Sequence, residues 1–173
     1  MYLQLLILIC LSVIVYQDMR YRAVYWMCFP VLTIMLFICK EEHAGLTDAL
    51  ADAGYGAAFV GLQLFLVWAY IFMKHQRPVN IVDHYLGLGD VLFLLSLVFY
   101  FSPVNYALFY IGSLIIVLAY ALVQVSFFKR KNLRIPLAGL QALCFMLLLV
   151  LSVIYRDLKI YSDFWIWKLT LQL

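Results

Sequence analysis

Residues 105–128 have the sequence NYALFYIGSLIIVLAYALVQVSFF, which contains no charged side chain. A helix of this length rises about 36 Å at roughly 1.5 Å per residue, enough to cross the roughly 30 Å hydrocarbon core of a bilayer. Similar apolar runs occupy residues 1–17, 23–39, 54–73, 84–101 and 136–155. The sequence therefore predicts an all-α membrane protein built as a bundle of six transmembrane helices.

The overall composition agrees with this prediction. Of the 173 residues, 68% are hydrophobic and 12% are charged, against about 45–50% and about 25% in an ordinary soluble domain. The net charge of +3 is scattered between the apolar runs, so it does not indicate nucleic-acid binding. We expect one membrane domain, residues 1–155, followed by an amphipathic interfacial tail, residues 156–173, which carries Trp165, Trp167 and Lys168.

The first apolar run lacks the basic leading region and the cleavage site of a signal peptide, so we expect it to be retained as a helix. The cysteines lie within or at the ends of apolar runs, with neither CxxC spacing nor a neighbouring histidine cluster. We expect them to be apolar packing residues, and we predict neither a metal site nor a cofactor. These cysteines are Cys10, Cys28, Cys39 and Cys144.

The distribution of basic residues predicts the orientation in the membrane. If the N-terminus lies outside, eight basic residues fall on the cytoplasmic side and four fall outside, which is the bias found in membrane proteins. The segment 40–53, which we expect to be an outer loop, is largely acidic. The cytoplasmic set is Arg20, Arg22, Lys74, Arg77, Lys129, Arg130, Lys131 and Arg134, and the outer set is Lys40, Arg156, Lys159 and Lys168.

Two aspartates are predicted to lie inside the membrane at the same depth. Asp18 precedes Arg22 by four residues, which places it about 6 Å inside the first helix. If the fourth helix begins near Asp83 and His84, Asp90 lies about 10 Å from the same face. Ionisable groups at membrane depth are costly and by default mark a functional site.

Paired carboxylates can carry out acid–base chemistry. Two like charges a few ångströms apart cannot easily both ionise, so one carboxylate can act as a base while the other acts as an acid. Such a pair can activate a water for attack on a peptide carbonyl and protonate the carbonyl oxygen. Gly87 and Gly89, just before Asp90, are expected to free the backbone and to let a substrate chain approach closely.

Two motifs resemble those of a known family. Asp18-Met19-Arg20-Tyr21-Arg22 and Gly87-Leu88-Gly89-Asp90 are similar to the two aspartate motifs of the type IV prepilin peptidases, the six-helix GxGD aspartic proteases of prokaryotic membranes. The similarity covers residues 1–155 and includes a basic loop followed by Ile135-Pro136. It implies that Asp18 and Asp90 form a catalytic pair and that no cofactor is needed. The implied substrate is a pilin-like precursor, whose short basic leader is cut at the cytoplasmic face of the inner membrane.

The chain departs from this family at three points. Many members have a lysine where this chain has Leu92, and a proline where it has Val24-Tyr25. The chain also has no room for the cysteine-containing cytoplasmic segment of the members that methylate the new N-terminus. The resemblance therefore implies cleavage without N-methylation.

Other interpretations stay open from the sequence alone. Asp18 could be a solvated residue that pairs with Arg20 or Arg22, and Asp90 could cap its own helix. The rival function is a small proton-coupled transporter or an assembly factor that uses the same carboxylates. We expect three glutamines to form hydrogen bonds across the bundle, with one possible exception at a substrate groove, and three small residues to mediate close helix packing. These are Gln63, Gln124 and Gln141, and Gly54, Ala58 and Gly61.

Overall fold

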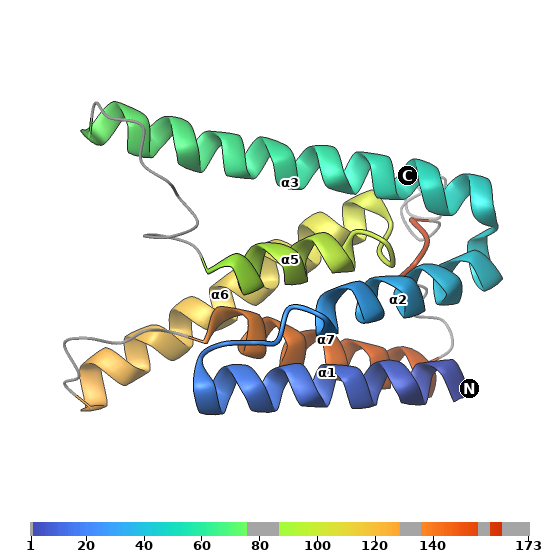
Figure 1. The fold of residues 1–173 in the computed structure, drawn as a ribbon, viewed down its shortest axis with the longest axis horizontal. Helices are drawn as coiled ribbons and strands as arrows, with labels where there is room; N and C mark the ends of the chain where they lie inside the picture. The colour runs from blue at the N-terminus through green and yellow to red at the C-terminus, as the bar shows by residue number, and fades with distance from the viewer. Residues whose placement is uncertain (1, 76–86, 129–135, 156–159, 164–173) are drawn as a thin grey trace, which may run out of the picture.

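The structure of the protein is a computed structural model that describes residues 2–75, 87–128, 136–155 and 160–163. These residues form helices and short turns, without a strand. The all-α class predicted from the sequence is therefore confirmed. The helices are α1 (Tyr2–Tyr21), α2 (Cys28–Ala44), α3 (Leu46–His75), α5 (Leu88–Leu97), α6 (Pro103–Phe128) and α7 (Leu137–Ile154) (Figure 1).

Four of these helices, α1, α3, α6 and α7, are long and apolar enough to cross a membrane. The transmembrane character of the chain is supported by these helices, whereas α2, with 17 residues, and α5, with 10, are shorter. The fourth predicted run, 84–101, contains α5 and the turn after it. Asp83 and His84, where this helix was predicted to begin, lie outside the described residues. The count of six spans stays a prediction.

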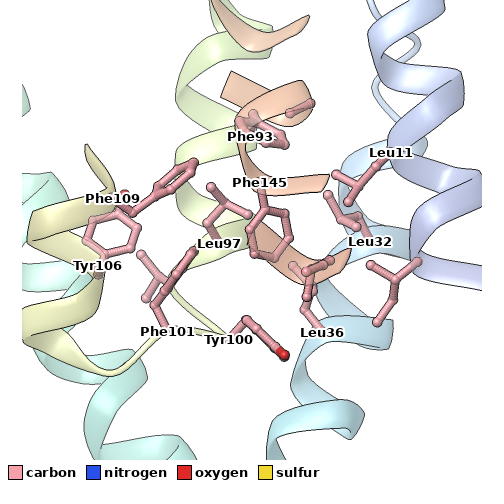
Figure 2. Packing of buried hydrophobic residues seen from close by; sticks show 14 of the residues in the cluster. Leu11, Leu32, Leu36, Phe93, Leu97, Tyr100, Phe101, Tyr106, Phe109 and Phe145 are labelled. Atoms are coloured by element: carbon pink, nitrogen blue, oxygen red, sulfur yellow. The ribbon is translucent and has the colours of Figure 1, made fainter. Parts of the chain in front are cut away.

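The helices pack around one hydrophobic core. Helix α1 lies against α7 and α2, while α5 contacts α2, α7 and α3 (Figure 1). Leucines and aromatic rings from these helices meet in the middle of the bundle (Figure 2). The largest side chains of this core include Leu11, Leu32, Leu36, Phe93, Leu97, Phe101, Phe109 and Phe145.

The segment 40–53 is not the loop expected from its acidic composition. Helix α2 continues to Ala44, and α3 begins at Leu46, after a turn at Gly45, whose φ of 85° is in the region that favours glycine. Glu41, Glu42 and Asp48 are exposed on these helices, whereas Lys40 on α2 pairs with Asp52 on α3. Lys40 is fully buried, and its Nζ lies 2.8 Å from Asp52 Oδ2.

Close helix packing on α3 occurs at a different glycine from the predicted ones. Nothing lies within 4 Å of a Cβ added at Gly54 or Gly61, so the prediction of close packing there is wrong. A Cβ added at Gly56 would instead lie 2.8 Å from Cγ1 of Val98. Gly56 faces the bundle and the other two glycines face outward, a difference that depends on how α3 is rotated.

Candidate active site

Asp18 lies in the last turn of α1, with 7% of its surface exposed. Its Oδ2 accepts a hydrogen bond from the backbone N–H of Gly139 at 2.5 Å. The helix ends at Tyr21 because Arg22 has a left-handed conformation, with φ of 54°, and its N–H donates to the carbonyl of Asp18 at 3.0 Å. Asp18 follows Leu11 and Ile14 on the buried face of α1, which directs its side chain into the bundle.

Asp90 is the third residue of α5. Gly87 is the N-cap, and the Asp90 N–H donates to the Gly87 carbonyl at 3.0 Å. Oδ1 of Asp90 accepts a hydrogen bond from the backbone N–H of Ala138 at 2.8 Å. One carboxylate oxygen is therefore directed toward α7, while the other, Oδ2, lies beside Gly87 at the beginning of α5, whose backbone also interacts with the carboxylate.

Both aspartates meet at the N-terminus of α7. The N-cap residue Pro136 makes no side-chain capping hydrogen bond, although the first N–H groups of a helix need an acceptor from outside the helix. Ala138 and Gly139 are the second and third residues of α7, the positions that a capping side chain ordinarily serves. Here, carboxylates from two other helices accept these hydrogen bonds, and the helix dipole favours negative charge at this end.

The two carboxylates lie close together. They bind the amides of consecutive residues, whose Cα atoms are about 3.8 Å apart, and their charges interact electrostatically. Gly139 packs directly on Asp18, since a Cβ added at residue 139 would lie 2.9 Å from Oδ2. The structure thus brings together the two aspartates that the sequence singled out at separate positions.

Gly87 and Gly89 occupy ordinary backbone conformations. Gly87 has φ of −65° and ψ of 134°, which any residue adopts, and Gly89 lies inside α5. A Cβ added at Gly87 would lie 3.0 Å from Oδ2 of Asp90, whereas one at Gly89 would lie 3.6 Å from the ring of Phe29. Gly87 therefore leaves room beside the Asp90 carboxylate. The backbone freedom of glycine, which the sequence suggested as its role, is not needed for the conformation of Gly87.

The two alternative roles of the aspartates, an ion pair of Asp18 with an arginine and an N-cap formed by Asp90, fit the geometry less well. Asp18 is buried and forms no ion pair with Arg20 or Arg22, or with any other described residue. Asp90 is not the N-cap of α5, because Gly87 occupies that position. Both carboxylates cap α7, and the Asp90 carboxylate also interacts with the backbone of Gly87, so part of the capping role predicted for Asp90 on its own helix is present.

Sequence reasoning missed the contribution of α7. Ala138 and Gly139 act through backbone amides, which leave little trace in a sequence. In the sequence, Pro136 indicates only the beginning of a helix. Gly139, close to that beginning, is the one further residue that could have indicated a close approach by another chain segment. Comparison of the chain with protein-family models, with curated proteins and with solved structures found no match.

Proposed function

We propose that this protein is an intramembrane aspartic endopeptidase, in which Asp18 and Asp90 form the catalytic pair. The observation that supports the proposal is the convergence of the two carboxylates on consecutive amides of α7. One carboxylate removes a proton from water while the resulting hydroxide attacks the peptide carbonyl, and the other protonates the carbonyl oxygen. The C–N bond then breaks as the leaving amine takes up a proton. This division of labour needs no cofactor.

The proposed substrate is a pilin-like precursor with a short basic leader, which is removed without N-methylation. The motif resemblance supports this choice, and so does the place of the pair, at the end of α1 and the beginning of α5, near one face of the bundle. In this proposal the chain crosses the prokaryotic inner membrane six times, with its N-terminus outside and its active site toward the cytoplasm. Gly87 and Gly89 border the approach of the substrate.

The rival transporter function would need polar side chains that continue from the aspartates across the bilayer. Beyond the pair, the middle of the bundle is filled mainly by leucine and phenylalanine side chains (Figure 2). This packing favours the peptidase over a proton relay. The residues that fill the middle include Phe93, Leu97, Phe109 and Phe145.

The test is cleavage of a tagged type IV pilin precursor that is co-expressed with the protein or with its Asp18→Asn or Asp90→Asn variant. Asparagine keeps an oxygen that can accept the hydrogen bond from Gly139 or Ala138, so the cap on α7 is retained while the acid–base chemistry is lost. We expect the wild-type protein to shorten the precursor and both variants to leave it intact, with unchanged amounts of protein in the membrane.

Alanine variants provide the structural control. Asp18→Ala and Asp90→Ala remove the capping oxygen too, and each should lower stability by about 1 kcal/mol relative to the asparagine variant. An asparagine variant that still shortens the precursor would refute the catalytic pair. A precursor that the wild-type protein leaves intact would refute this substrate.

A further inference from the structure

The inner face of α3 changes character along its length. From its beginning to Val60, the residues that face the bundle are buried, with Ala53 7% exposed and Val60 3%. Gln63 and Val67 continue the same face but are only half-buried, and Ile71, one turn further, is 5% exposed. The packing of α3 against the bundle is therefore looser over a short stretch around Gln63.

This stretch lies at the depth of the aspartate pair. Gly56 contacts Val98 at the end of α5, and α3 and α5 run in opposite directions (Figure 1). Gln63 lies seven residues beyond Gly56, about 10 Å along α3, and Asp90 lies eight residues before Val98, about 12 Å along α5 and its turn. Since seven residues are close to two helical turns, Gln63 shares the face of Gly56.

Gln63 differs from Gln124 and Gln141, the other two glutamines for which the sequence predicts hydrogen bonds across the bundle. Gln141 donates from Nε2 to Oγ of Ser113 on α6, at 3.3 Å, across the bundle as predicted. Gln124 donates from Nε2 to the hydroxyl of Tyr120, at 3.1 Å, within α6 itself, so the prediction of a bond across the bundle is wrong for this residue. Gln63 makes no hydrogen bond with any residue in the described part of the chain. An amide without partners is unfavourable in an apolar medium, so the position of Gln63 in a span-length helix calls for a partner from outside the fold.

We propose that Gln63 binds the backbone of the substrate beside the bond that is cut, and that the substrate reaches the aspartates between α3 and α5. The inference rests on the proposed peptidase function and extends it to substrate binding. A bond next to a hydrophobic helix becomes accessible only when the local helix opens, and the freed N–H and C=O groups then need partners within the membrane. A glutamine amide supplies two donors and an acceptor, so it can pair with both groups of an extended chain.

The first experiment compares cleavage and stability in Gln63→Leu and Gln124→Leu, with the tagged pilin precursor as substrate. Gln63→Leu should lower kcat/KM at least tenfold, mainly through KM, without lowering the melting temperature, because it removes an amide that has no partner within the fold. Gln124→Leu should cleave as the wild-type protein does. Normal cleavage by Gln63→Leu would overturn the inference while leaving the peptidase function intact.

The second experiment detects contact without cleavage. A photo-crosslinking amino acid is placed at residue 63 or at residue 62 in the Asp90→Asn protein, which holds the uncleaved precursor. Leu62 is 55% exposed and faces away from the bundle, so residue 62 should crosslink weakly and residue 63 strongly. Equal crosslinking from the two positions would overturn the inference. Absence of cleavage by the wild-type protein would instead refute the proposed substrate, on which the inference rests.

Discussion

Gly139 is the residue whose size most directly affects the aspartate pair. Its N–H binds Asp18, and a Cβ added to it would lie 2.9 Å from Oδ2 and 3.0 Å from Cβ of that aspartate. Such distances are too short for unbonded heavy atoms, so a side chain at residue 139 must move the carboxylate. Glycine is therefore required here for close approach, although its helix propensity is poor.

We predict that Gly139→Ala lowers cleavage strongly without unfolding the protein. Alanine favours the helix by about 1 kcal/mol over glycine, but displacement of a catalytic group by about 1 Å can cost roughly 100-fold in rate. The measurement is kcat/KM together with the melting temperature. Gly112→Ala on α6 is the matched control, because nothing lies within 4 Å of its added Cβ, and it should keep full activity. Equal activity of the two variants would contradict the assigned geometry.

At the scale of elements, Lys40 joins three parts of the fold. Its Nζ donates to the carbonyl of Phe101 at 2.7 Å and pairs with Asp52 at 2.8 Å. These contacts tie α2 to α3 and to the connection between α5 and α6. A charge that is fully buried persists only when it is paired in this way.

We predict that Lys40→Met lowers the free energy of unfolding by about 2–3 kcal/mol, since hydrogen bonds to charged groups contribute about 1.5–3 kcal/mol. The estimate stays below the cost for a fully buried pair because Asp52 is 24% exposed. Denaturation in detergent micelles measures the effect. The double variant Lys40→Met/Asp52→Leu should recover part of the loss, because it leaves no unpaired carboxylate. If the double variant is less stable than the single one, the Lys40–Asp52 ion pair is not the source of the predicted loss in the free energy of unfolding.

For the whole molecule, the proposed orientation places the turn between α2 and α3 outside and the end of α1 inside. Glu42 and Arg20 are both exposed and lie near these two places. A polar segment that carries several acidic residues is tolerated outside, whereas basic residues are retained on the cytoplasmic side. The two ends of the bundle are therefore chemically distinct.

We predict that a membrane-impermeant maleimide labels Glu42→Cys in intact spheroplasts and labels Arg20→Cys only after the membrane is disrupted. The unchanged protein, with its own four cysteines, gives the background. The opposite pattern would invert the proposed topology and place the aspartate pair on the outer side, away from a cytoplasmic leader.

The features that depend on local composition could be predicted from the sequence. Long apolar runs must form helices in a membrane because backbone groups there need internal partners, and the all-α class followed from this. Asp18 and Asp90 were identifiable because carboxylates within apolar helices are rare. The acidic segment 40–53 was misread as a loop because composition does not reveal that Lys40 and Asp52 pair across two helices.

The contacts that these residues make depend on packing between distant parts of the chain and could not be predicted from the sequence. Backbone amides are the same in every residue, so only the fold shows that Ala138 and Gly139 receive the two carboxylates. The rotation of α3 about its axis decided that Gly56, not Gly54 or Gly61, packs closely. Packing between distant segments sets which side chains find partners, and for this reason the difference between Gln63 and Gln141 became visible only in three dimensions.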